Sequence, residues 1–311
     1  MTDLLTRSQL RMLAQTLNVE PAMIESLARL GAQDLRALRE RISELLFDAD
    51  EPVFARLSTL APLVPNTLVT KVVATVVPPE VGGRAGGALG LAHPNRVADV
   101  LSALPAQYLA DAAPHLDPRT IGALAPLLSG TTLIPTAIEL LRRRDYTTAN
   151  RFIEHATDAL IDDLERGIDD DIGLLRAVSV TPDTDRLNAV LARIPAARQT
   201  AVLRATTADT DETLLAGLSI LARLDDESRA HQVTALIEAL DTEELTRVVS
   251  VAAENDALGE LLTALAATGE PVRRRVAEII GAAGDLAAAL GEAASTDELR
   301  GLLADLRALH A

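Results

Sequence analysis

The alternation of helix-starting residues with short amphipathic runs constrains the fold of this chain more than any other sequence feature. From about residue 93 onward, a Pro, Asp or Thr usually opens each run, about 10 to 14 residues follow with one apolar face, and a further breaker closes it. A run with a single apolar face cannot bury that face alone, so neighbouring runs are expected to stack as an α-solenoid. The expected openings are Pro94, Pro105, Pro118, Pro135, Thr147, Thr157, Asp170, Thr181, Ala196, Thr210, Asp226, Asp241, Asn255, Glu270, Gly284 and Thr296.

Composition favours helices over strands. Hydrophobic residues make up 48% of the chain and aromatic residues only 2%. The apolar residues are mainly Ala, Leu, Val and Ile, and Ala and Leu are strong helix formers. A β-sandwich would contain more aromatic and β-branched residues. We therefore predict an all-α fold: a right- or left-handed α-solenoid, or superhelix, of short helices with a small N-terminal helical cap.

Three segments are expected along the chain. The first is an N-terminal three-helix cap over residues 1–50, and the second is an apolar, Gly/Pro-rich helical connector over 51–92. The third is the helical-repeat solenoid over 93–311. In the cap, Asp48, Asp50 and Pro52 are expected to break the chain after the third helix. The three helices of the cap are expected at Ser8–Leu17, at Pro21–Leu30 (ended by Gly31) and at Asp34–Phe47.

The connector contains two local patterns. Val72, Val73, Val76 and Val77 would suit a strand on propensity alone, but helical neighbours on both sides favour a helix. Gly82, Gly86 and Gly90 recur every four residues, which places them on one side of a helix and favours close backbone packing, with ligand approach as the alternative. A phosphate loop is excluded because the required Gly-Lys-Ser/Thr sequence is missing.

Charge and cysteine content exclude several classes of function. The net charge is −16, and residues 156–311 hold 14 Arg against 29 acidic residues. Because this acidic half repels phosphate and has no aromatic residue for base stacking, no nucleic-acid binding is expected. The absence of Cys excludes disulfides, thiolate nucleophiles and cysteine metal sites. With neither a signal-peptide pattern at the N-terminus nor a charge-free apolar span, we expect a cytoplasmic protein.

One part of the solenoid segment resembles a known family. The sequence HPNRVADVLSALPAQYLADAAPHLDPRTIGALAPLLSG within His93–Leu141 resembles the repeats of the cytosolic N-terminal domain of MgtE-type magnesium transporters. Those repeats alternate an LP form with an LDP form, matched here by Leu104-Pro105 and Leu116-Asp117-Pro118. The match covers about a sixth of the chain clearly, and its architecture is similar to that of flagellar motor switch proteins and other armadillo-like modules.

The departures from this family define what the resemblance implies. In the transporter, sensor domains and a membrane pore follow this domain, and nothing after residue 160 resembles either. The family's magnesium-sensing acidic residues lie at the interface with those sensor domains, which has no visible counterpart in this sequence. The resemblance therefore implies a stand-alone helical module rather than a transporter.

An acidic cluster supplies the best metal-ligand candidates. His155, Asp158 and Asp162 are spaced i, i+3 and i+7, so on one helix they would share a face and hold a divalent ion through nitrogen and oxygen ligands. The alternative is a solvated helix face that also provides N-caps for the next unit.

Two arginine runs have opposite relations to their expected helices. Arg142, Arg143 and Arg144 end a helix, where cations complement the helix dipole; the alternative is a clamp for a phosphate or an acidic partner. The run 273–275 lies instead in the first turns of a helix, where the dipole disfavours cations. An ion pair between Glu270 and Arg274 is the expected compensation.

No catalytic motif is present. The five histidines lie in separate repeats, and neither H-E-x-x-H nor G-x-S-x-G occurs, so we expect neither an enzyme nor a cofactor.

The leading hypothesis is a non-catalytic protein-interaction or scaffold module whose protein partner has a basic surface. One alternative is a regulator that senses divalent cations such as Mg²⁺. Another alternative is a peripheral membrane protein that docks through residues 57–91. The competing interpretation, which we favour, is that this segment is buried between the cap and the repeats.

Overall fold

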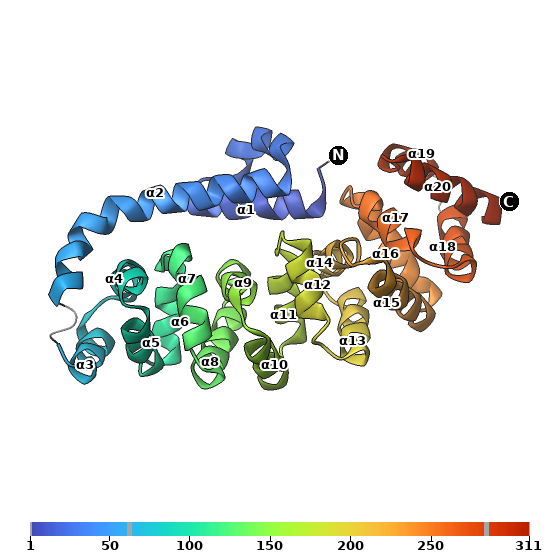
Figure 1. The fold of residues 1–311 in the computed structure, drawn as a ribbon. Coiled ribbons are helices and arrows are strands. Elements are labelled where there is room, and N and C mark those ends of the chain that lie inside the picture. The colour runs from blue at the N-terminus through green and yellow to red at the C-terminus, as the bar shows by residue number, and fades with distance from the viewer. Residues whose placement is uncertain (1, 61–63, 283–285, 311) are drawn as a thin grey trace. The chain divides into compact units, whose positions relative to one another are not determined.

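A computed structural model describes residues 2–60, 64–282 and 286–310 of the chain. About 82% of the chain is helical, and the described ranges contain twenty α-helices and no strand (Figure 1). The prediction of an all-α helical-repeat fold is confirmed. Gly284, which was expected to open a helix, lies outside the described residues, as does part of the 57–91 segment.

The chain forms two compact units. Unit 1 comprises residues 1–11, 21–33 and 178–311, and unit 2 comprises residues 12–20 and 34–177. Residues 1–50 thus contribute to both units, so these contacts group the chain differently from the three segments that the sequence suggested.

The N-terminal elements differ at their ends from the prediction. They are α1 (Leu4–Leu17), the 3₁₀ helix η1 (Pro21–Leu30) and α2 (Gly31–Leu60). Helix α1 begins earlier than expected because the Asp3 carboxylate accepts the Thr6 backbone N–H at 2.7 Å, as a capping residue does. Helix α2 continues through Pro52, so the predicted break was wrong. A proline removes a single helical donor, which bends a helix without necessarily ending it.

The helices of unit 2 stack in two rows. Helix α3 contacts α5, which contacts α7 and then α9, whereas α4, α6, α8 and α10 form the second series. The side-by-side order of α5 to α8 can be followed in Figure 1. Each helix therefore packs on the helix two places along the chain. The helices are α3 (Asn66–Val76), α4 (Pro79–Ala92), α5 (Pro94–Ser102), α6 (Ala106–Ala112), α7 (Pro118–Leu124), α8 (Gly130–Arg142), α9 (Tyr146–His155), α10 (Asp158–Gly167) and α11 (Asp171–Ser179), whose last two residues belong to unit 1.

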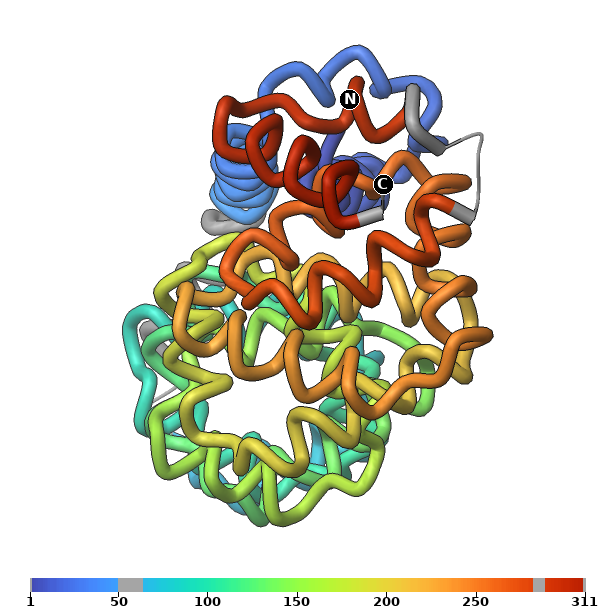
Figure 2. Tube along the Cα trace, turned by 90° about the vertical axis from the view of Figure 1, so that its right-hand side faces the viewer, coloured from blue at the N-terminus to red at the C-terminus, as the bar shows by residue number. Residues whose placement is uncertain are grey.

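Unit 1 repeats this arrangement. Its first series is α13, α15, α17 and α19, and its second is α14, α16, α18 and α20. The trace of these helices runs from yellow to red in Figure 2. The helices are α12 (Thr184–Leu191), α13 (Ala196–Thr207), α14 (Asp211–Leu221), α15 (Asp226–Ala239), α16 (Thr242–Glu254), α17 (Leu258–Ala266), α18 (Glu270–Ala282), α19 (Leu286–Ala293) and α20 (Asp297–His310).

Side-chain caps set many of the helix starts. Thr157, Thr210 and Asp241 each accept a hydrogen bond from a first-turn backbone N–H, as the sequence predicted. Asp241 forms a complete capping box with Glu244. Pro135 was wrongly expected to open a helix. It lies inside α8, whose first turn precedes it, so the missing donor removes only one hydrogen bond.

Three arginines of unit 1 bind the C-terminal ends of earlier helices. Each guanidinium donates two hydrogen bonds to backbone carbonyl oxygens at the end of the helix three places earlier in the chain, namely α11, α13 and α15. These carbonyls lack helical partners, and the guanidinium is a fork of fixed geometry, so one side chain satisfies two of them. We call the three the arginine ladder. The pairs are Arg223 with Ser179 and Thr181, Arg247 with Thr207 and Asp209, and Arg275 with Ile237 and Leu240.

Arg223 shows the energetics of the ladder most clearly. Its Nη2 donates to the Ser179 carbonyl at 2.6 Å, and its Nε donates to the Ser219 carbonyl at 2.8 Å. Burial lowers the pKa of the guanidinium to about 10 because the charged form loses hydration. The side chain still carries its proton at neutral pH, so the charge must be compensated by the carbonyl oxygens that surround it.

Replacing Arg223 by lysine tests the ladder. Lysine has one ammonium group and cannot reach the Ser179 and Thr181 carbonyls together, so we expect Arg223→Lys to lower the free energy of unfolding by about 1–3 kcal/mol. Urea denaturation followed by circular dichroism measures this. The exposed Arg274, which pairs with Glu270, is the matched control, and Arg274→Lys should change stability by less than about 0.5 kcal/mol. Equal effects of the two substitutions would contradict a structural role for the ladder.

Glycines allow α4 to lie unusually close to its neighbours. The glycines of α4 do pack closely, but the positions that face backbone atoms are Gly83 and Gly87 rather than the predicted Gly82, Gly86 and Gly90, whose nearest neighbours are side chains. A Cβ atom on Gly87 would lie 2.7 Å from the Asp117 backbone nitrogen. A Cβ on Gly86 would lie at an ordinary 3.6 Å from a Leu116 methyl group. Helix α4 can therefore approach the chain around residues 112–120 only because these positions lack side chains.

Neighbouring glycines should respond oppositely to alanine. Gly86→Ala should raise the free energy of unfolding by about 0.5–1 kcal/mol, because alanine restricts the unfolded chain and fits the available space. Gly87→Ala should lower it by about 1–3 kcal/mol, because the methyl group meets backbone atoms that cannot move independently. Thermal and urea unfolding of the two variants provides the comparison, and the same sign for both would argue against this packing.

Candidate functional site

The predicted arginine cluster does end a helix. Arg142 is the last residue of α8, Arg143 is its C-cap, and Arg144 follows with a φ of 59°. The Arg144 N–H donates to the Leu141 carbonyl at 2.8 Å, and the next N–H donates to Leu140 at 3.0 Å. This is a Schellman ending, in which glycine usually takes the left-handed position.

Two of the three guanidinium groups already have partners within unit 2. Arg142 and Arg143 both bind the Glu139 carboxylate, each at 2.7 Å, and Arg143 also pairs with Asp111. The two guanidinium groups together lower the pKa of Glu139 to about 2. Arg144 is exposed and makes no ion pair with a residue that the structure describes. Of the predicted partner-binding residues, Arg144 is therefore the one whose charge is not engaged.

The predicted metal ligands do not share a helix face. His155 is the last residue of α9, whereas Asp158 and Asp162 belong to α10. Thr157 caps α10 and interrupts the helix between them, so the inference from the i, i+3, i+7 spacing was wrong. Over the described ranges, no three His, Asp or Glu side chains are grouped as a metal ion would require. His155 instead lies beside Gly122 of α7.

Unit 1 has its acidic side chains outside and many of its arginines turned inward. Every Asp and Glu that the structure describes within residues 178–311 is exposed, apart from the half-buried Glu244 and Glu260. The arginine ladder, by contrast, is half-buried and bound to backbone carbonyls. Arg229 and Arg273 also donate to carbonyl oxygens, those of Ala222 and Ala266. The negative charge of this unit therefore dominates its surface more than the composition alone implies.

Helix α3 carries apolar side chains on two faces. None of its residues is buried. On the outer face Leu68, Val72 and Val76 have 53%, 44% and 75% of their surface exposed. Val69 and Val73 instead face the interior of unit 2. The expectation that this segment is buried between cap and repeats is therefore wrong for the outer face of α3.

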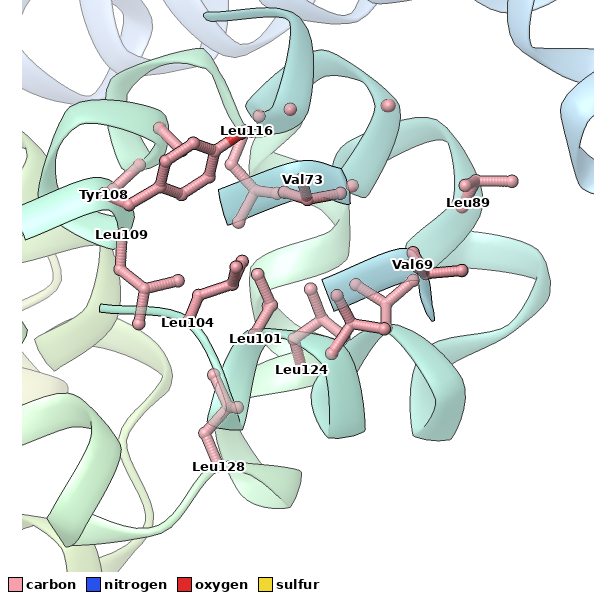
Figure 3. Close-up of a pocket in the computed structure, with 18 of the residues that line it drawn as sticks. Val69, Val73, Leu89, Leu101, Leu104, Tyr108, Leu109, Leu116, Leu124 and Leu128 are labelled. Atoms are coloured by element: carbon pink, nitrogen blue, oxygen red, sulfur yellow. The ribbon is translucent and has the colours of Figure 1, made fainter. Parts of the chain in front are cut away.

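Beneath α3 lies an apolar pocket of about 380 Å³. It is enclosed by elements from α3 to α9, all within unit 2, and Figure 3 shows the side chains of Val73, Leu101 and Leu116 pointing toward a common space. Pockets of 300–1,000 Å³ are typical of small-molecule sites. The aliphatic lining includes Val64, Val69, Val73, Val77, Val81, Leu89, Val97, Val100, Leu101, Leu104, Leu109, Leu116, Leu124, Leu128 and Leu133, and the aromatic lining is Tyr108 and Phe152.

Polar groups at the rim hold the two ends of α3. Arg96 donates to the carbonyl of Val64, just before the helix, and the Tyr108 hydroxyl donates to the carbonyl of Val77, just after it, at 3.2 Å. Burial raises the pKa of the Tyr108 phenol. Among the residues that the structure describes, none of those lining the pocket is acidic, and the basic ones are His93 and Arg96. Helix α3 thus receives a hydrogen bond at each end and packs on α5 beside the apolar space.

The pocket was not predicted from the sequence, although part of its signal was visible. The connector is apolar and rich in glycine and valine, and Val97, Val100, Leu101 and Leu104 have the spacing of one apolar helix face. In the structure all four line the pocket; Val97 and Leu104 are buried, and Val100 and Leu101 are half-buried. An apolar face that is incompletely covered cannot be distinguished from a filled core by residue spacing alone.

Comparison with protein families, with curated proteins and with solved structures found no match to this chain. The resemblance to the MgtE N-terminal domain therefore stays a prediction. Within the described residues, no helix is both long enough and apolar enough to cross a bilayer.

Proposed function

We propose that the chain is a non-catalytic helical-repeat interaction module that binds a basic protein surface through the acidic face of unit 1. The observation that carries the proposal is the separation of charge in this unit. Arginine guanidinium groups bind backbone carbonyls, whereas acidic side chains remain exposed. The proposal keeps the cytoplasmic location expected from the sequence.

The position of the acidic residues supports this role. Many stand in the first turns of successive helices, such as Glu212 of α14, Glu227 of α15 and Glu243 of α16. There they stabilise the helix dipole and still present a charge to solvent. Because consecutive helices stack in order, such charges recur along the unit, and a repeated array of like charge attracts and orients an oppositely charged partner.

Neutralising three exposed first-turn acids tests the proposal. We expect the triple variant Glu227→Gln, Glu243→Gln, Glu298→Gln to bind a fluorescent deca-lysine peptide at least about threefold more weakly than the parent. The reason is that each lost ion pair between an exposed glutamate and a peptide lysine costs about 0.2–1 kcal/mol of binding free energy. Fluorescence anisotropy at several salt concentrations measures this, and binding should weaken as salt rises.

The matched control is Glu20→Gln, Glu40→Gln, Glu80→Gln, three exposed acids of unit 2. It should retain most of the affinity. Quantitative mass spectrometry of cellular proteins retained by the parent and both triple variants extends the test. A basic protein should be retained by the parent and the control but lost with the unit 1 variant. Equal loss in both variants, or no binding at low salt, would refute the proposal.

The outer face of α3 favours a second candidate function, docking to a membrane surface. Leu68, Val72 and Val76 form an exposed apolar stripe, and the sequence of α3 contains no acidic residue and a single cation, Lys71. Burial of such a stripe in the interfacial region of a bilayer is favourable. Interfacial helices usually carry more cations than this, which makes docking the second candidate rather than the first.

Vesicle flotation distinguishes this candidate. The chain should float with phosphatidylcholine vesicles, and the variant Leu68→Gln, Val72→Gln, Val76→Gln should not, because its stripe no longer gains from burial. The control Leu45→Gln, Leu46→Gln, Ile138→Gln replaces three exposed apolar residues elsewhere in unit 2 and should float like the parent. Flotation that does not depend on the α3 stripe, or no flotation at all, counts against docking through this helix.

A further inference from the structure

We propose that the apolar pocket of unit 2 binds a free long-chain fatty acid, with its alkyl tail between α3 and the helices beneath it and its carboxylate beside His93 and Arg96. This inference does not depend on binding of a basic partner by unit 1. It rests on the shape, lining and polarity of a cavity that lies wholly within unit 2.

The lining selects a flexible aliphatic group. Valine, leucine, alanine and glycine supply most of the surface, and a volume of about 380 Å³ lies within the range of small-molecule pockets. Two of the hydroxyl groups in the lining already have hydrogen-bond acceptors. Tyr108 donates to Val77, and Thr136 donates to the Thr132 carbonyl at 2.9 Å. A ligand with polar groups along its length would leave them without hydrogen-bond partners, whereas an alkyl chain has none to lose.

The basic lining residues, His93 and Arg96, lie at the N-terminal end of α5. His93 is the N-cap of α5 and Arg96 lies in its first turn, whereas the pocket-lining residues that follow on α5, from Val97 to Leu101, are aliphatic. Helix α5 thus supplies a cationic end and an apolar end. Among the described residues the lining contains no Asp or Glu, so a carboxylate would meet the Arg96 guanidinium without repulsion. Arg96 donates one N–H to Val64 and has further donors for a carboxylate.

Glycine and α3 together explain how a tail could be accommodated. Gly86 of α4 lines the pocket, and a side chain at this position would occupy part of the space. Helix α3 contributes Val69 and Val73 to another wall of the pocket without any buried residue of its own. An alkyl chain filling the space would bring these two walls into contact through the ligand.

Titration with saturated fatty acids of increasing length tests the inference. Isothermal calorimetry of the full chain with octanoate, decanoate, laurate and myristate should show Kd falling about fourfold per added methylene, as expected for transfer of a methylene from water into an apolar site. The dependence should level off when the tail fills the pocket. A Kd that does not change with tail length would overturn the proposal.

Variants locate the site. Gly86→Leu should abolish laurate binding or weaken it by at least tenfold, because the new side chain occupies the pocket. Gly301→Leu, which gains a side chain in open space on α20, should bind like the parent. Should circular dichroism show that Gly86→Leu loses helix, Val69→Trp on the wall formed by α3 takes its place. Unchanged laurate affinity in a folded pocket-filling variant would overturn the proposal.

A neutral analogue tests the carboxylate end. Arg96→Gln should weaken laurate binding by about fivefold or more and leave dodecanol binding within about twofold, since only laurate carries a charge for Arg96 to pair with. Equal weakening of both ligands would overturn the carboxylate assignment. The last experiment measures binding of the chain to phosphatidylcholine vesicles. Binding to vesicles without binding of laurate would assign the apolar character of this region to a membrane surface and overturn the fatty-acid site.

Discussion

Packing of each helix on the helix two places along the chain is the interaction on which the rest of the structure depends. The helices are short, and isolated helices of such length are marginal in water. Their apolar stripes become stabilising only when a neighbour covers them. Both units use this arrangement, with one series of odd-numbered and one of even-numbered helices. Caps such as Thr210 and Asp241 then define where each helix begins, and the glycines of α4 set how closely a neighbour can approach.

The arginine ladder adds a second kind of contact to this packing. It connects helix ends that are 35 to 44 residues apart in the chain, and it turns positive charge toward backbone carbonyls. The acidic residues of unit 1 therefore lie mainly at its surface, whereas many of its arginines do not.

Unit 2 differs from unit 1 because its distinguishing feature is an apolar pocket rather than a charged surface. Helix α3 spans a pocket that it only partly fills, and its outer side chains remain exposed.

The sequence predicted the features that depend on local chemistry. Helical periodicity, N-cap residues such as Thr157 and Asp241, and the ion pair between Glu270 and Arg274 are set within a few residues, and the structure contains each of them. Pro52 and Pro135 misled the prediction because a proline costs one hydrogen bond, which the packing of a whole helix can outweigh. The metal-ligand spacing failed for a local reason, since the cap at Thr157 already separated His155 from Asp158. The ladder and the pocket depend on distant segments and had no residue-level signal.

The reach of the ladder has a consequence for how unit 1 loses its structure. In a simple stack, each repeat is coupled only to its neighbours, so melting begins at an end and spreads like a one-dimensional transition. Bonds from Arg223, Arg247 and Arg275 extend that coupling across three helices and overlap along the chain. Local unfolding of one helix then breaks contacts at more than one interface, so it costs more free energy and occurs less often. Unit 1 is thereby built to open as a larger cooperative block than stacking alone would produce.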